Sequence, residues 1–483
     1  MNRNFVAADL GASSGRTIVG TFDGGKFTLK ETNRFWNGAT EIGGTLYWDF
    51  VHLFRSIQEG IVATRRETGN QIASIAVDTW GVDFGFLDAQ GKLLGNPVNY
   101  RDSRTNGMTE KVFDAVGKET VFNQTGIQFM QLNTLYQMYA LAQSNDAQYL
   151  AADKFLFVPD LLNYWLTGKA ATNRTFASTS QFYNPVTKDW AFDMLQKLNI
   201  RTDFFAPFAE TGTVLGEYGG TPVVNVGSHD TASAFAAVPV AAGERCAFLS
   251  SGTWSLLGTE LKTPVINADA LAANFTNEVG VCDTIRFLKN LSGLWIIQEL
   301  RRVWAEQGCD YSWNDMMKLA DAAAPLEFFV NPGDDLFIAP GDMAVRIQDY
   351  CKRTGQKVPQ EHGQIIRAAY EGLALLYADT YDTLETLSGQ KLDTLRIVGG
   401  GSKNITLNQF AANATGRRVI TGPIEATAIG NIIVQMLAMG DIKTLDEGRE
   451  IIRRSFAHET QTFEPQNTAQ WQTALATWRK FCR

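Results

Sequence analysis

The sequence predicts an α/β protein that is built from two related halves. The chain has 483 residues, which is more than one domain usually holds. Short apolar strands alternate with amphipathic helices along it. A strand, a turn of small residues and a second strand occupy residues 5–22, and the same order recurs over residues 246–260. We therefore expect one domain over residues 1–240 and another over residues 241–483.

The composition excludes several classes of protein. Hydrophobic residues make up 45% and charged residues 19% of the chain, as in an ordinary globular enzyme. The net charge of −8 disfavours a nucleic-acid-binding protein. Five scattered cysteines without a CxxC spacing, and only four histidines, predict neither a disulfide framework nor a zinc site. The start of the chain lacks a signal-peptide layout, and the longest apolar helix candidate, Ala426 to Met439, is too short for a bilayer. We expect a cytoplasmic protein with no membrane association and no obligate protein partner.

The first strands carry a candidate anion site. Residues 5–10, 17–22 and 26–31 read as strands, with a tight turn at residues 11–16. Backbone N–H groups of such a turn can point at an anion, and the hydroxyls of Ser13 and Ser14 add donors. Asp9, just before the turn, is placed to hold a divalent ion through water, as Mg²⁺ sites usually do. An ordinary glycine hairpin with a solvated Asp9 remains the alternative.

A second polar cluster follows a helix at residues 49–66 and a buried strand at residues 72–77. Trp80 and the carboxylates of Asp78 and Asp83 crowd the end of this strand around Gly81. An aromatic face joined with polar groups is typical of a sugar site. A core tryptophan flanked by surface carboxylates explains the same pattern. Residues 100–104 form a further polar cluster, either an internal ion pair or part of a binding site.

The centre of the chain holds the candidate catalytic carboxylate. An apolar run over residues 222–226 reads as a buried strand, and Ser228, His229, Asp230 and Thr231 follow it. Side chains at the carboxyl end of a strand lie where α/β proteins place their chemistry. The alternative is that Asp230 only caps the helix that follows.

The second half repeats this organisation with glycine-rich turns. We expect strands at residues 246–250, 256–260, 284–290, 395–398 and 418–420, and helices at residues 364–387 and 403–414 and, last in the chain, from Glu425. Gly399 to Gly401 lie at a strand-to-helix turn, where glycines let a phosphate approach the backbone closely. Neither a GxGxxG motif nor a P-loop is present.

Three of these motifs together resemble those of the FGGY family of carbohydrate kinases. They are Asp9 to Arg16, Ser250 to Ser255, and Val398 to Ser402. The resemblance extends to residues 78–84, 100–107, 228–234 and 287–290, and so covers nearly the whole chain. It implies two actin-like, ribonuclease-H-like ATPase domains that face a central cleft, with the sugar and the catalytic base in the first and the nucleotide in the second.

The resemblance also implies a role for each matching residue. Asp230 would be the catalytic base, and Asp9 would lie near Mg²⁺. The residues expected to bind ATP are Ala12, Ser13, Ser14, Gly15, Arg16, Thr253, Gln298 and Gly400. Those expected to bind the sugar are Gly81, His229, Asp230, Thr231 and Asn290.

The implied reaction is transfer of the γ-phosphate of ATP, with Mg²⁺, to the 1-hydroxyl of a ketose. Phosphoryl transfer needs positioning, charge neutralisation and one group that takes the hydroxyl proton, and no covalent nucleophile. L-Rhamnulose is the expected ketose, with L-fuculose or L-xylulose as alternatives. A non-catalytic actin-like sensor of ATP and sugar is the alternative from a different class.

Overall fold

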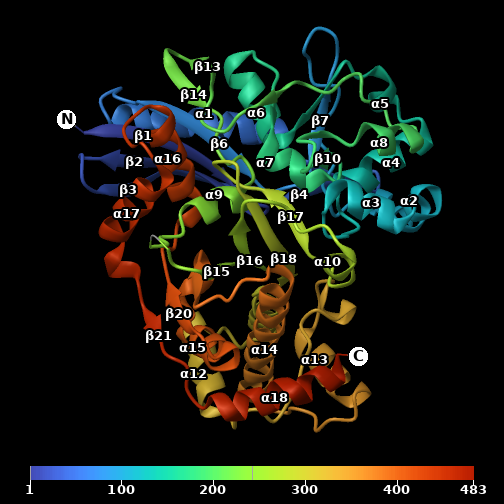
Figure 1. The fold of residues 1–483 in the computed structure, drawn as a ribbon, viewed down its shortest axis with the longest axis vertical. Coiled ribbons are helices and arrows are strands. Elements are labelled where there is room, and N and C mark those ends of the chain that lie inside the picture. The colour runs from blue at the N-terminus through green and yellow to red at the C-terminus, as the bar shows by residue number, and fades with distance from the viewer. Residues whose placement is uncertain (1, 242, 483) are drawn as a thin grey trace. The chain divides into compact units, whose positions relative to one another are not determined.

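The computed structural model describes residues 2–241 and 243–482, and the chain divides into two compact units (Figure 1). Unit 1 comprises Met1–Ala241, Glu260–Phe287 and Ala426–Ala457. Unit 2 comprises Ala242–Thr259, Leu288–Glu425 and His458–Arg483. Unit 1 therefore includes two segments from the C-terminal half of the sequence.

The sheet of unit 1 has the strand order β13-β14-β6-β1-β2-β3. The predicted hairpin forms here, because β1 pairs antiparallel with β2, and β2 with β3. On its other side β1 pairs in parallel with β6, and β6 in parallel with β14. Three parallel strands therefore bring their carboxyl ends to one edge. The strands are β1 (Arg3–Leu10), β2 (Ser14–Phe22), β3 (Phe27–Trp36), β6 (Ser74–Thr79), β13 (Val214–Tyr218) and β14 (Thr221–Val224).

Helices cover this sheet because each presents an apolar stripe to it. Leu53, Ile57 and Ile61 of α1 (Phe50–Glu67) share one buried cluster with β1, β6 and α6 (Val158–Thr167). Asp49 caps α1, and its Oδ1 accepts a hydrogen bond from the His52 N–H at 3.1 Å, as predicted. The helices α9 (Asp230–Ala236) and α16 (Ala426–Ala438) pack against each other, and Ala236 and Val434 join Ala76 of β6 in another cluster.

Residues between β6 and β13 build a second core in unit 1 that is rich in aromatic side chains. Phe84, Phe86, Phe155, Phe157 and Phe204 lie in it, all buried. The elements involved are β7 (Phe84–Leu87), β8 (Lys154–Phe157), α2 (Met108–Val116), α3 (Lys118–Thr125), α4 (Thr134–Ser144), α5 (Ala147–Ala151), α7 (Arg174–Ala177), η2 (Ser178–Ser180), β10 (Tyr183–Asn184), β11 (Asp189–Trp190) and α8 (Phe192–Lys197). Although it lies much further along the chain, β17 (Thr276–Val279) contacts α7 and η2.

The second sheet runs in the order β17-β18-β16-β15-β19-β20-β21, and its strands β15, β19, β20 and β21 belong to unit 2. The antiparallel pair β15–β16 is the second predicted hairpin, and β19 pairs with β15 in parallel. The predicted long helix is α14, whose tyrosines are buried as expected, and the Tyr377 hydroxyl lies 2.7 Å from Ser255 Oγ. The elements are β15 (Cys246–Ser251), β16 (Trp254–Leu261), β18 (Ile285–Ser292), α11 (Trp295–Glu306), α12 (Trp313–Ala322), α13 (Met343–Arg353), α14 (His362–Ser388), β19 (Thr394–Val398), η4 (Gly400–Lys403), α15 (Ile405–Thr415), β20 (Arg418–Thr421) and β21 (Thr462–Phe463).

The helix that begins near Glu425 is not the last one, contrary to the prediction. Two helices follow α16: α17 (Leu445–Ser455) and α18 (Thr468–Phe481). The sequence of α17 is dominated by charged residues, and Ile451 and Ile452 are its buried aliphatic side chains, so its apolar stripe is narrow. Within residues 2–241 and 243–482, no helix is both long and apolar enough to cross a membrane.

Candidate functional site

Neighbouring strand ends in unit 1 bring three carboxylates to one edge of the sheet. Asp9 of β1 is the direct register partner of Asp78 of β6. The segment after β14 continues beside β6, since the Thr79 N–H donates to the Ser228 carbonyl at 2.9 Å and Thr79 pairs with His229. Asp230 follows immediately. The carboxyl edge of a parallel sheet is where α/β proteins place reactive groups, and here it carries Asp9, Asp78 and Asp230.

Asp230 has one oxygen that is held and one that is free. Its Oδ1 accepts hydrogen bonds from the Thr231 N–H at 2.6 Å and the Thr231 hydroxyl at 3.0 Å. No described residue donates to Oδ2, and 31% of the side chain is exposed. Asp230 is the first residue of α9, after the cap position His229, and its contact with the Thr231 N–H of the first helical turn uses Oδ1 alone. The carboxylate is therefore fixed in orientation with an oxygen available for a proton.

The surroundings of Asp230 make it a stronger base than an ordinary surface carboxylate. Burial raises the pKa of Asp230, and the negative charge of Asp9 raises it further. His229 and the two donors of Thr231 oppose this rise without cancelling it. A raised pKa brings a carboxylate closer to the operating pH, where general-base catalysis is most efficient.

Asp9 is engaged by an arginine from the same hairpin. The Arg16 Nη2 and Nε atoms lie 2.9 and 3.1 Å from Asp9 Oδ2. Behind Asp9, the Asp78 Oδ2 accepts a hydrogen bond from Asn431 Nδ2 of α16 at 2.5 Å, and its buried Oδ1 has no donor among the described residues. Burial and the charge of Asp9 raise the pKa of Asp78 well above its usual range.

This edge fits a magnesium ion that shares its ligands with a substrate. Among residues 2–241 and 243–482, no three His, Cys, Asp or Glu side chains gather as a ready-made metal site. Mg²⁺ is usually held by one or two carboxylates with water and phosphate oxygens. Asp9 is a carboxylate of this kind, and Asp78 lies beside it in register with a pKa raised well above its usual range.

The turn between β1 and β2 is held by Asn37. Its side-chain Nδ2 donates to the Gly11 carbonyl at 2.6 Å and its backbone N–H donates to the Ser13 carbonyl at 3.2 Å. The Gly11 N–H closes the turn on the Ser14 carbonyl at 3.0 Å. Ser13 is exposed at the turn, whereas Gly15 is buried. The turn thus spans only residues 11–13, at the same edge as Asp9, and is shorter than the predicted 11–16 because Ser14, Gly15 and Arg16 already belong to β2.

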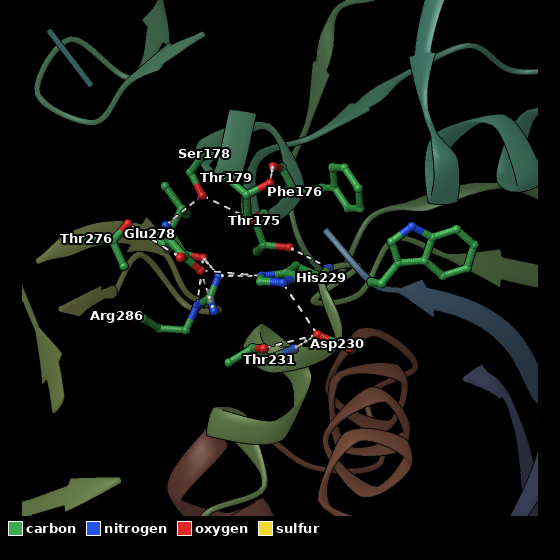
Figure 2. Close-up of polar contacts among 12 residues, drawn as sticks. Thr175, Phe176, Ser178, Thr179, His229, Asp230, Thr231, Thr276, Glu278 and Arg286 are labelled. Carbon is green, nitrogen blue, oxygen red and sulfur yellow. Dashed lines mark hydrogen bonds and ion pairs between the residues drawn. The ribbon is translucent and has the colours of Figure 1, made fainter. Parts of the chain in front are cut away.

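His229 lies between two carboxylates (Figure 2). Its Nε2 is 3.4 Å from Asp230 Oδ1, and its Nδ1 is 3.4 Å from Glu278 Oε2. Arg286, which is fully buried, places Nη2 at 3.3 Å from the same Nδ1 and Nη1 at 3.0 Å from Glu278 Oε2. Burial would raise the pKa of Glu278, but Arg286 and His229 outweigh it, and the pKa of Glu278 is lowered.

Gly81 packs against His229 because it has no side chain. A Cβ atom at Gly81 would lie 3.1 Å from His229 Nε2, closer than most side-chain contacts. The adjoining Val82 has a φ of 70°, an unusual backbone conformation for a β-branched residue and a mark of a constrained loop. The loop at residues 80–83 therefore lies directly beside the His229–Asp230 pair.

The carboxylates around Trp80 are buried, so the alternative of surface carboxylates is wrong. Trp80 is in the core, and Asp78 and Asp83 are both inaccessible to solvent. The indole N–H groups of Trp48 and Trp80 donate to Asp83 Oδ2 at 2.6 and 2.9 Å. Burial raises the pKa of Asp83 to about 6, although these donors oppose the rise. Asp83 thus anchors the loop that carries Gly81.

In unit 2 the second hairpin meets the start of α11. The Thr253 hydroxyl donates to Gln298 Oε1 at 3.2 Å, so these two predicted nucleotide residues lie together. The N–H groups of Leu294 and Trp295 donate to the carbonyls of Gly252 and Thr253 at 2.9 and 3.2 Å. A Cβ atom at Gly293 would lie 2.5 Å from the backbone of Trp254, so only glycine fits there. Gly400 begins η4, and Asn290 lies on β18.

Within each unit, the structure brings most of the predicted site residues of that unit close to one another. In unit 1 it brings Gly81, His229 and Asp230 together, with Thr231 bonded to Asp230 and Asp9 near enough to raise its pKa. The sequence reasoning missed Glu278 and Arg286, and considered Asp78 only as part of a candidate sugar-binding cluster. A signal was present for Arg286, because a charged residue inside an apolar strand needs a buried partner.

Comparisons with known proteins point to one family over nearly the whole chain. Residues 5–244 match the model of the N-terminal domain of the FGGY family of carbohydrate kinases, and residues 247–439 match that of its C-terminal domain. A rhamnulokinase from Bacteroides thetaiotaomicron is 44% identical, with 98% of each chain covered. A rhamnulokinase from Bacillus subtilis is 38% identical, with 94% of each chain covered.

Solved structures of low sequence identity share the fold. A xylulose kinase from Lactobacillus acidophilus superposes with a TM-score of 0.81 at 16% identity, covering 99% of this chain and 97% of its own. Plasmodium falciparum glycerol kinase with ADP gives a TM-score of 0.80 at 16% identity and the same coverage. These likenesses confirm the predicted two-domain α/β fold of the actin-like ATPase type.

Proposed function

Because this chain belongs to the FGGY family of carbohydrate kinases, we propose that it transfers the γ-phosphate of ATP to the 1-hydroxyl of L-rhamnulose, giving L-rhamnulose 1-phosphate and ADP. The observation that carries the proposal is the fixed Asp230 carboxylate with its free Oδ2, in a chain whose full-length relatives are rhamnulokinases. The nature of the sugar rests on these relatives, and the reaction class rests also on the geometry of the site.

In the proposed mechanism Asp230 is the general base. Its Oδ2 accepts the proton of the 1-hydroxyl as the sugar oxygen attacks the γ-phosphorus, and the bond from phosphorus to the β-phosphate bridging oxygen breaks. Such a base contributes roughly 10²–10⁴-fold to the rate. Gly81, His229 and Thr231 border the sugar beside Asp230, and Asn290 is assigned to it as well.

The nucleotide is assigned to both hairpins. Residues 12–16 would offer donors to the phosphates, and Thr253, Gln298 and Gly400 would bind the nucleotide. Asp9 would hold Mg²⁺, which supplies charge neutralisation at the phosphates when it is bound. Preorganised donors and charges of this kind usually provide the largest part of the rate enhancement.

ADP release tests the proposal directly. The purified protein is assayed with ATP and Mg²⁺ against L-rhamnulose, L-fuculose, L-xylulose, L-ribulose and glycerol. We expect rapid ADP release with L-rhamnulose and far slower release with the other four. Faster turnover on another ketose would replace the substrate and leave the reaction class intact. An absence of sugar-dependent ADP release, in a protein that still binds ATP, would refute the proposal.

A further inference from the structure

We propose that Glu278 and Arg286 are positioning residues that hold the imidazole of His229 with its proton on Nε2, facing the carboxylate of Asp230. The kinetic consequence of this arrangement rests on the function proposed above. The arrangement itself concerns side chains within unit 1 and is measurable without turnover (Figure 2).

Arg286 is fixed in place by the strand beside it. Its side chain is fully buried, and both Nε and Nη2 donate to the Val279 carbonyl at 3.2 Å. Its Nη1 faces Glu278 Oε2 at 3.0 Å. Glu278 is buried in turn, and its Oε1 accepts a hydrogen bond from the Thr276 hydroxyl at 3.4 Å. A buried arginine is tolerated only with such a partner, so the two side chains form one rigid unit.

The position of Arg286 decides which nitrogen of His229 carries the proton. A guanidinium can only donate, so a hydrogen bond across the 3.3 Å between Arg286 Nη2 and His229 Nδ1 needs Nδ1 as its acceptor. A neutral imidazole with an acceptor at Nδ1 carries its proton on Nε2. That nitrogen lies 3.4 Å from Asp230 Oδ1. Glu278 Oε2 also lies 3.4 Å from Nδ1, but it faces Arg286 more closely.

The charged groups around His229 come from three elements. Asp230 belongs to α9, Glu278 to β17 and Arg286 to β18. Asp9 of β1 adds negative charge on the side of Asp230. The imidazole is thus enclosed by one positive and two negative neighbours.

This tautomer of His229 gives the two oxygens of the Asp230 carboxylate different roles. Both Thr231 donors and the Nε2 proton of His229 face Oδ1. Oδ2 remains the oxygen that points to substrate. With the other tautomer, His229 would present a lone pair to Oδ1, and the carboxylate would lose a favourable contact and be held by the Thr231 donors alone.

A buried ion pair in unit 2 serves as the matched control. Arg367 Nε and Glu371 Oε1 of α14 lie 2.7 Å apart, both side chains are almost inaccessible to solvent, and they also bond to backbone groups of residues 320–326. Replacing both members of a buried pair with neutral side chains avoids the strong penalty of leaving one charge unpaired. The two double variants are Glu278→Gln with Arg286→Met, and Glu371→Gln with Arg367→Met.

Steady-state kinetics separates a positioning role from a structural one. We expect kcat of the Glu278→Gln, Arg286→Met variant to fall about 10–100-fold, because misplacement of about 1 Å can cost about 100-fold in rate. The KM for ATP stays within about twofold, since Glu278 and Arg286 contact each other, His229, Thr276 and Val279 and none of the residues assigned to ATP. The control variant keeps its kcat. A kcat of the first variant equal to that of the control would overturn the proposal.

Nitrogen-15 NMR of histidine-labelled protein tests the tautomer directly. The four histidines give resolved imidazole signals, and His229→Asn identifies the one in question. We expect a protonated Nε2 and an unprotonated Nδ1 in the unmodified protein at neutral pH, and a tautomer mixture in the double variant. A protonated Nδ1 in the unmodified protein would overturn the inference even if the variant failed to fold. Failure of the proposed function would appear instead as missing sugar-dependent ADP release, with this NMR pattern intact.

Discussion

The two hairpins of this protein share a topology and differ in charge. Both consist of antiparallel strands joined by a turn of small residues: β1–β2 in unit 1 and β15–β16 in unit 2. In the first, Asp9 and Arg16 are cross-strand partners one step from the turn, and they form an ion pair. In the second, the corresponding pair next to the turn is Ser250 and Leu256, and the polar contact of the turn is the neutral bond from Thr253 to Gln298.

The difference indicates that the first hairpin acts through charged groups and the second through close packing and hydrogen bonds. Unit 1 gathers acidic, basic and imidazole groups at one sheet edge, which suits proton transfer and metal binding. Unit 2 offers hydroxyl, amide and backbone groups held by close packing, which suits a ligand recognised by its shape and hydrogen bonds. Substitutions in the first hairpin should therefore alter kcat and its pH dependence, and those in the second should alter the KM for ATP.

The largest effect is expected at Asp9. Asp9→Asn removes the negative charge proposed to hold Mg²⁺ and breaks the ion pair with Arg16, so kcat should fall about 100-fold or more. Asp23→Asn is the control, because Asp23 accepts hydrogen bonds only within the distant β2–β3 turn. Steady-state assays over a range of Mg²⁺ concentrations provide the measurement. Equal kcat values for Asp9→Asn and Asp23→Asn would contradict the proposed role of charge in the first hairpin.

A smaller effect is expected at Gly293. The Cβ atom of Gly293→Ala would lie 2.5 Å from the Trp254 backbone, which forces the turn of the second hairpin to move. Overpacking of this kind costs about 1–3 kcal/mol, so we expect the KM for ATP to rise about tenfold. The matched control is Gly25→Ala, where the nearest atom to an added Cβ is 3.7 Å away. An unchanged KM with a reduced kcat would contradict the assignment of this turn to the nucleotide.

The sequence predicted the elements with strong apolar periodicity and failed where partners are distant. Both hairpins and α14 follow from local patterns, as does the position of Asp230 after β14. The ion pair of Asp9 with Arg16 could not be derived, because it depends on strand register. Glu278 and Arg286 meet His229 only through the packing of β17 and β18, about 50 residues further along the chain. The charged helix α17 was missed because its apolar stripe is narrow.

The pH dependence of kcat distinguishes the two regions further. Burial and the charge of Asp9 raise the pKa of Asp230. On acidification, kcat should therefore begin to fall at a higher pH than it would with an ordinary carboxylate as the base. Thr231→Val removes a donor to the ionised form and raises this pKa further, so the acid limb should move up by about one pH unit. Initial rates between about pH 5 and 8, with both substrates at saturating concentrations, measure the shift of the acid limb. A limb that moves to lower pH would be inconsistent with Asp230 as the base.

The smallest effect is expected at Thr253. Thr253→Val removes the hydrogen bond to Gln298, worth about 0.5–1.5 kcal/mol, and should raise the KM for ATP a few-fold. The acid limb of kcat should stay in place, because neither partner of this bond titrates. A shift of the limb in this variant would show that the second hairpin also influences the base.

The central claim is that Asp230 takes the proton from the sugar hydroxyl. Asp230→Asn keeps the size of the side chain and an oxygen for the Thr231 donors, but removes the base. Turnover and ATP binding are measured together for this variant with L-rhamnulose as the sugar. We expect kcat to fall about 10²–10⁴-fold with ATP affinity unchanged. Turnover close to that of the unmodified protein would contradict the mechanism, whatever the sugar.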